Sequence, residues 1–161
     1  MPLLTALAIA IGIIAVPVIW IFLGPLAPFQ FQIWQCFLGW GCFYHCGGKA
    51  AGLKTTIICT VFGAFIGALV VISAGYLGFM GSLAVPVAGA VGAAIIVFAA
   101  NIPLLSAIPA SVYGFAAIAA FILLKGAAPL EALPPTVGSL VIGALVGWVS
   151  ELAGARLAKP V

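Results

Sequence analysis

Residues 55–75 read TTIICTVFGAFIGALVVISAG, an apolar run of helical length without a charged side chain. This run belongs to a longer uncharged stretch, Thr55 to Leu124, and a second such stretch covers Met1 to Gly48. A soluble protein needs charge over most of its surface, because Lys, Arg, Glu and Asp are rarely buried. The runs are continuous rather than alternating, which disfavours β-barrel strands. The sequence therefore predicts an all-α integral membrane protein.

The few charged residues are confined to short gaps between apolar runs. Hydrophobic residues make up 66% of the chain and charged residues 4%. The charged residues are Lys49, Lys54, Lys125, Glu131, Glu151, Arg156 and Lys159. The formal net charge of +3 is too small and too dispersed to indicate a nucleic-acid partner, so we interpret it as a topology signal.

Helix length sets the number of spans. A bilayer core about 30 Å thick needs about 20 apolar residues per helix. We therefore expect one transmembrane domain over residues 1–161, with six helices near 3–23, 30–47, 55–75, 82–101, 104–124 and 136–156. Gly- and Pro-rich turns separate these spans, the longest at 47–54 and 125–135.

The basic residues predict the orientation. With both termini in the cytoplasm, the inner side carries Lys49, Lys54, Arg156 and Lys159, and the outer side carries only Lys125. The positive-inside rule favours this arrangement. The first span lacks a positive n-region, so we expect a retained helix rather than a signal peptide.

An internal repeat relates the two halves of the chain, approximately 1–78 and 79–161. VFGAFIGALVV at 61–71 resembles VGSLVIGALVG at 137–147, and the same alignment pairs Thr60 with Thr136. Three spans per unit would place the two units in opposite orientations. We therefore expect two inverted three-helix repeats, an architecture typical of transporters, with the pathway at the repeat interface.

The second and fifth predicted helices hold the unusual residues. The second is the most polar and aromatic stretch of the chain, and two prolines near the start of the fifth predict an irregular helix there. Irregular backbone in a membrane must line a cavity or be buried in protein. We expect the pore-lining or solute-binding residues to be Trp34, Gln35, Gly39, Trp40, Cys42, Phe43, His45, Asn101, Ser106, Pro109, Ser111 and Tyr113.

Two motifs carry a resemblance to a known family. They are Trp34-x-x-Phe37-Leu38-Gly39, followed by Phe43-Tyr44 and a Gly-Gly-x-x-x-Gly-Leu-Lys turn ending at Lys54, and Leu105-Ser106-x-x-Pro109-x-x-x-x-Gly114. In these residues the chain resembles a family of small bacterial inner-membrane proteins of unknown function, typified by the YcdZ inner-membrane protein. The resemblance implies a bacterial inner-membrane location and a six-helix domain, but it implies no substrate.

These residues could serve in metal binding, in lining a pathway or in helix packing. Cys42, His45 and Cys46 form C-x-x-H-C, whose ligand types suit a soft metal, but no second ligand pair follows, so we expect no metal and no cofactor. His45 either lines the pathway or anchors the helix at the interface. Trp40 lies too far inside its helix for an interfacial belt, although core packing explains each aromatic side chain equally well.

Two functions remain open. The first is a channel or facilitator for a small neutral or weakly polar solute such as urea, an amide, ammonia, CO2 or water, with one narrow pore per subunit of a homo-oligomer. The second is a non-transporting assembly or regulatory subunit that binds other helices through its Gly-x-x-x-Gly faces. We expect no enzymatic activity, because the chain has no Asp/Glu/His cluster, no phosphate-binding loop and no Ser-His-Asp set.

Overall fold

The computed structural model describes residues 2–158, and the helical class predicted from sequence is confirmed there. No strand occurs in those residues. Residues 2–158 form six α-helices and three short 3-10 helices, which in order are α1 (Leu3–Leu23), η1 (Ala27–Phe29), α2 (Ile33–His45), α3 (Lys49–Tyr76), η2 (Gly78–Leu83), α4 (Ala84–Ala99), η3 (Pro103–Leu105), α5 (Ile108–Lys125) and α6 (Pro129–Leu157).

Five of these helical segments are long and apolar enough to cross a membrane, and α2 is not among them. The predicted full-length span at 30–47 is wrong, because α2 has only 13 residues. At 1.5 Å per residue it is about 20 Å long, which is shorter than a bilayer core of about 30 Å. Residues 31–32 are non-helical, and the helix ends just before the Gly47-Gly48 turn.

Two predicted gaps are shorter than expected. Helix α3 begins at Lys49, directly after Gly48, rather than at residue 55. Helix α6 begins at Pro129 and continues through Pro134 and Pro135. A proline in the first turn needs no N–H partner, so Pro129 starts the helix at no cost to its hydrogen bonds.

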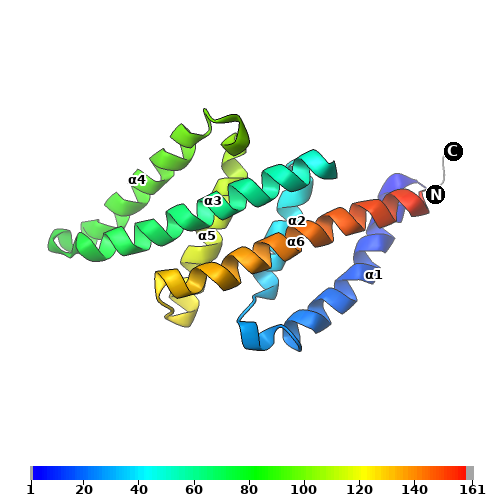
Figure 1. Ribbon diagram of the computed structural model, residues 1–161, viewed down its shortest axis with the longest axis horizontal. Helices are drawn as coiled ribbons and strands as arrows, with labels where there is room; N and C mark the ends of the chain where they lie inside the picture. The colour runs from blue at the N-terminus through cyan, green and yellow to red at the C-terminus, as the bar shows by residue number, and fades with distance from the viewer. Residues whose placement is uncertain (1, 159–161) are drawn as a thin grey trace.

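The helices form two similar groups around a central pair (Figure 1). Helices α3 and α6 contact each other and run in opposite directions. Helices α4 and α5 pack on α3, whereas α1 and α2 pack on α6. The closest pairings are therefore α3 with α5 and α2 with α6, and α2 touches α5 over a much smaller area.

Glycines allow the backbones of these pairs to approach closely. A Cβ atom added at any of four glycines would collide with a carbonyl oxygen of the facing helix. The pairs are Gly63 with Ser111, Gly114 with Thr60, Gly143 with Cys36, and Gly39 with Leu140. The Gly-x-x-x-Gly faces are thus used inside the subunit, where small residues permit tight helix packing in a membrane protein.

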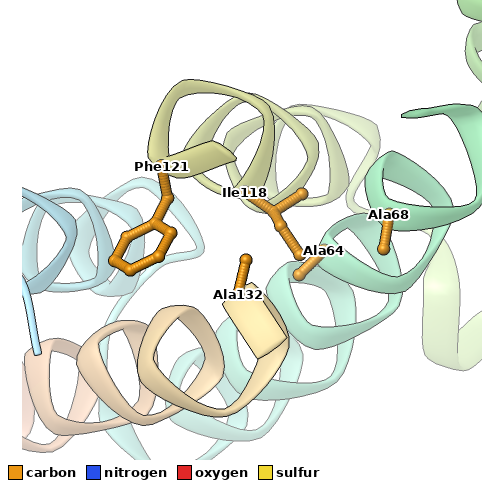
Figure 2. Packing of buried hydrophobic residues seen from close by; sticks show 5 residues of the cluster. All are labelled: Ala64, Ala68, Ile118, Phe121 and Ala132. Atoms are coloured by element: carbon orange, nitrogen blue, oxygen red, sulfur yellow. The ribbon is translucent and has the colours of Figure 1, made fainter. Parts of the chain in front are cut away.

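A buried apolar cluster joins α3, α5 and α6 (Figure 2). Ile118 of α5 points toward Ala64 of α3, with Ala68 one turn along α3, and Ala132 of α6 lies between Ala64 and Phe121 of α5. The two large side chains fill the space that the alanines leave, which is how membrane helices gain van der Waals contact. This cluster holds α5 in place beside α2, where most of the polar residues lie.

Candidate functional site

Gln35 is the central polar residue of the bundle. Its side chain is completely buried, and its Nε2 donates hydrogen bonds to the Ala117 carbonyl of α5 and to Thr136 Oγ1 of α6, both at 3.1 Å. Within residues 2–158, its Oε1 has no hydrogen-bond partner. Gln35 therefore joins three helices and keeps one free acceptor in the interior.

The start of α2 is held by α6. The backbone N–H of Gln32 donates to Ser139 Oγ at 2.9 Å, and this hydroxyl donates to the Pro135 carbonyl at 2.6 Å. A hydroxyl from a neighbouring helix thus satisfies an amide that precedes the first turn of α2, where backbone donors lack intrahelical partners. This contact sets the position of Gln35, one turn further along.

A second polar region lies near the other end of α2, and we call it the thiol cluster. Cys42 and Cys59 are buried against Ala110, and Cys46 lies beside them with its Sγ 3.9 Å from that of Cys42. All four cysteines of the chain are free thiols. The cluster therefore gathers weakly polar sulfur atoms from α2 and α3 against the first turn of α5.

Two buried hydroxyls border the thiol cluster. Thr56 lies beside Cys42, and Ser111 lies beside Cys59. Both side chains are fully buried, and in the described part of the chain each hydroxyl has only the neighbouring thiol, a weak hydrogen-bonding group, within reach. Thr60, by contrast, satisfies its hydroxyl by donating to the Thr56 carbonyl at 2.7 Å.

A groove of about 330 Å³ separates α2 from α5 outside the thiol cluster. Its lining residues are Phe37, Leu38, Gly41, Cys42, His45 and Tyr113. The rings of His45 and Tyr113 meet edge to face at 5.9 Å. Because Cys42 belongs to both the groove and the cluster, the buried thiols lie directly behind the surface of this groove.

A larger cavity of about 620 Å³ lies at the opposite end of α2, and we call it the Lys125 cavity. Its lining residues are Ala27, Pro28, Phe29, Gln30, Gln32, Lys125, Ala127, Glu131 and Pro135. Gln32 and Pro135 thus connect the cavity wall to the contacts that position Gln35.

Two polar residues of α2 share one face. Gln35 and Cys42 are seven residues apart, which brings them to the same side of the helix, whereas Gln32, just before α2, and His45, at its end, lie to either side of that face. Sequence reasoning missed Gln32 as well as the facing Thr56, Thr136 and Ser139. Gln32 could have been found from its three-residue spacing from Gln35, and the other three residues from the presence of hydroxyls within otherwise apolar runs.

Three of the predicted pathway residues face α6 instead. Gly39 meets the Leu140 backbone, and Phe43 packs on Gly147. Trp40 is 5% exposed, and its indole N–H donates to Ser150 Oγ at 3.0 Å. Trp34 lies elsewhere, since it packs on the apolar cluster of Figure 2. Gly39, Trp40 and Phe43 therefore contact α6 rather than the fifth helix.

The irregular backbone predicted around the two prolines is found at residues 101–107, but it ends sooner than expected. Helix α5 is regular from Ile108, and Pro109 occupies its first turn, where a proline is tolerated. The irregular backbone lies before it, in η3. Asn101 and Ser106 are exposed there and donate to the local carbonyls of Phe98 and Pro103. Of the predicted residues in this segment, Tyr113 meets His45 of α2, and Ser111 packs against Gly63 and Cys59 of α3.

The C-x-x-H-C residues do not converge on one point. Within residues 2–158, no group of three or more His, Cys, Asp or Glu side chains is arranged to hold a metal ion. The ring of His45 instead rests against Tyr113.

A comparison with protein families identifies the family of this chain. The model of a family described as "Protein of unknown function (DUF1097)" matches residues 8–155. The chain belongs to this family. The match confirms the membership of an unknown-function family that the two sequence motifs predicted, and it does not bear on the likeness to the YcdZ protein. No curated protein and no solved structure matches the chain. The family description assigns no activity, so the function is argued from the site.

Proposed function

We propose that this protein is a passive facilitator for a small neutral solute that carries hydrogen-bonding groups, located in the bacterial inner membrane with both termini in the cytoplasm. The observation that carries the proposal is the buried Gln35 Oε1, which has no partner in the described residues, together with two buried hydroxyls, Thr56 Oγ1 and Ser111 Oγ, that meet only thiols. The proposed path follows the polar face of α2 from the Lys125 cavity past Gln35 and the thiol cluster to the groove beside His45.

Unpaired polar atoms are costly in a membrane protein. Leaving a buried donor or acceptor unsatisfied costs about 1–3 kcal/mol, and lipid offers no replacement partner. A water molecule or a solute that carries N–H or O–H groups would satisfy Gln35 Oε1 and the two hydroxyls. These buried atoms in two regions of the bundle support a path for hydrogen-bonding molecules over a purely structural role.

The charge distribution supports passive movement of a neutral molecule. The polar side chains between the Lys125 cavity and the groove are amides, hydroxyls and thiols, and none is Asp, Glu, Lys or Arg. An ion would have to leave water without a compensating charge, which is expensive in a low-dielectric interior. Without a buried charge, the site also has no obvious means of coupling to an ion gradient.

We infer in addition that the two halves form an inverted repeat. The glycine contacts between α3 and α5 have counterparts between α6 and α2. Gly63 on Ser111 corresponds to Gly143 on Cys36, Gly114 on Thr60 corresponds to Gly39 on Leu140, and Gly67 on Ile118 corresponds to Gly147 on Phe43. The opposite directions of α3 and α6 (Figure 1) fit a pseudo-two-fold axis in the membrane plane.

The same correspondence relates the two polar regions of the path. It pairs Thr136 with Thr56, Ala117 with Cys42, and Gln35 with Ala110. The contact of the Gln35 amide with Ala117 therefore occupies the place in one half that the contact of the Cys42 thiol with Ala110 occupies in the other half. The two contacts differ in their chemistry. A path built from two related half-sites across the repeat axis agrees with the pathway position in inverted-repeat transporters.

The alternative of an assembly subunit has less support. It relied on Gly-x-x-x-Gly faces that bind other helices, but Gly63, Gly67, Gly143 and Gly147 all face helices of the same subunit. A homo-oligomer with one path per subunit remains part of the proposal, since the path lies within one chain.

Flux measurements with matched variants test the proposal. The protein is reconstituted in liposomes, and permeability to water, ammonia, urea and a small amide is followed by stopped-flow light scattering or internal pH. Gln35→Met removes the free acceptor at similar length, and flux should fall roughly tenfold, the effect of losing about 1.4 kcal/mol of interaction. Thr60→Val is the control, because it removes a buried hydroxyl that already has a partner.

Two outcomes would overturn this function. One is the absence of flux above that of empty liposomes for every solute of the panel. The other is unchanged flux in folded Gln35→Met protein, which would place the path elsewhere in the bundle. Elution volume on size exclusion shows whether each variant is folded and of native oligomeric size.

A further inference from the structure

The Lys125 cavity collects the charges of one end of the molecule. The described charged residues outside it lie in the first turns of α3 (Lys49 and Lys54) or in the last turns of α6 (Glu151 and Arg156), at the opposite end of α2. Lys125 and Glu131, one basic and one acidic, both line this cavity. One basic and one acidic side chain, out of few charged residues in the chain, therefore line the same cavity.

The wall of the cavity is built from specific contacts. Gln30 adopts a left-handed backbone conformation with φ of 58°, and its carbonyl accepts a hydrogen bond from Gln32 Nε2 at 2.6 Å. A non-glycine residue in this conformation is strained by about 1–2 kcal/mol. Such strain persists only where surrounding contacts hold it, and it is concentrated at binding sites. The bond from Gln32 N–H to Ser139 supplies one of these contacts.

The size and lining of the cavity fit a small polar ligand. Its volume of about 620 Å³ lies within the range of about 300–1,000 Å³ for small-molecule sites. The two charges offset each other, so a simple cation or anion gains from one and is repelled by the other. A ligand with a positive and a negative group gains from both.

We propose that the Lys125 cavity binds a zwitterionic group in which an ammonium lies near an anionic oxygen, with Lys125 facing the anion and Glu131 facing the ammonium. This chemistry occurs in the headgroup of phosphatidylethanolamine and in free phosphoethanolamine. Lys125 and Glu131 lie at helix ends, where a bilayer presents its headgroups. Phe29 lines the same cavity with 65% of its surface exposed, so an acyl chain has an apolar contact beside the charged pair.

The proposal does not depend on solute movement through the interior, and binding alone tests it. Purified protein in detergent is titrated with short-chain phosphatidylethanolamine, phosphatidylcholine and phosphatidylglycerol of equal chain length, and with free phosphoethanolamine. The readout is the thermal unfolding midpoint, because a ligand that binds the folded state stabilises it. Phosphatidylethanolamine should raise the midpoint most. The trimethylated ammonium of phosphatidylcholine cannot donate hydrogen bonds to Glu131, and phosphatidylglycerol has no ammonium.

Substitution of the acidic residue gives the decisive comparison. Glu131→Gln should weaken phosphatidylethanolamine binding about tenfold, or roughly 1.4 kcal/mol, and remove its advantage over phosphatidylglycerol. Glu151→Gln, at the opposite end of the bundle, is the matched control and should leave that advantage intact. Stabilisation by free phosphoethanolamine as well as by the lipid would identify a soluble ligand, and stabilisation by the lipid alone would identify a headgroup site. Equal shifts with all three lipids, or an unchanged preference in Glu131→Gln, would overturn the proposal.

Discussion

The carboxylate of Glu151, near the end of α6, accepts a hydrogen bond of 2.8 Å from the backbone N–H of Lys49, the first residue of α3. The carboxylate thus caps a helix from another part of the chain. A negative charge at a helix N-terminus is favourable, because it satisfies an unpaired donor and complements the helix dipole. Gly48 makes room for it, since a Cβ at that position would collide with the carboxylate.

Loss of this cap should destabilise the protein. Glu151→Ala is expected to lower the free energy of unfolding by about 0.5–2 kcal/mol, the usual cost of removing an N-terminal cap. Glu151→Gln keeps an acceptor oxygen and should cost less. Thermal unfolding in detergent measures both, and equal midpoints for wild type and Glu151→Ala would show that the contact contributes nothing to stability.

Two glycines on α2 should respond in opposite ways to the same substitution. Gly39→Ala places a methyl group against the Leu140 carbonyl, whereas a Cβ at Gly41 meets nothing within 4 Å. Overpacking costs about 1–3 kcal/mol, so Gly39→Ala should lower the unfolding midpoint clearly and Gly41→Ala should leave it unchanged or raise it. A comparison of the two single variants in the same detergent decides this. Equal effects would contradict the close packing of α2 on α6.

The thiols report which face of α2 reaches water. Cys42 lines the groove, Cys46 is partly exposed, and Cys36 is buried against α6. In single-cysteine variants, a small water-soluble methanethiosulfonate should label Cys46 and Cys42 and spare Cys36, and labelling at Cys42 should reduce solute flux. Mass spectrometry of the intact protein follows the labelling. Cys42 as resistant as Cys36 would remove the groove from the path.

Reporter fusions test whether the short helix α2 crosses the membrane. Six crossings place both termini on the same side, as the basic residues predict, whereas five crossings place them on opposite sides. A reporter after Val161 and another in the Gly47-Gly48 turn should both be active only in the cytoplasmic form, and one within residues 126–128 only in the periplasmic form. A periplasmic signal at either of the first two sites would refute the proposed orientation.

Composition and charge spacing were enough to predict an all-helical membrane protein and most of its helices. Charged groups are excluded from an apolar solvent so strongly that their absence over 55–124 left few alternatives. The starts of α3 and α6 were less predictable. Helix α3 begins at Lys49, directly after a glycine turn, and α6 contains Pro134 and Pro135. In both places tertiary contacts outweigh the helix preferences of the local residues.

Sequence alone could not decide which faces of the helices meet. Apolar side chains are equally satisfied by lipid and by protein, so hydrophobicity did not reveal that Gly39, Trp40 and Phe43 pack on α6. The repeat illustrates the same limit. Sequence similarity paired Thr60 with Thr136, but the contacts align Gly63 with Gly143, one helical turn away. The sequence by itself determined that the helices of this protein lie in an apolar environment rather than in water. Only the tertiary structure decided the pairing of its helices, because close approach of backbones depends on where glycines of one helix meet carbonyls of another.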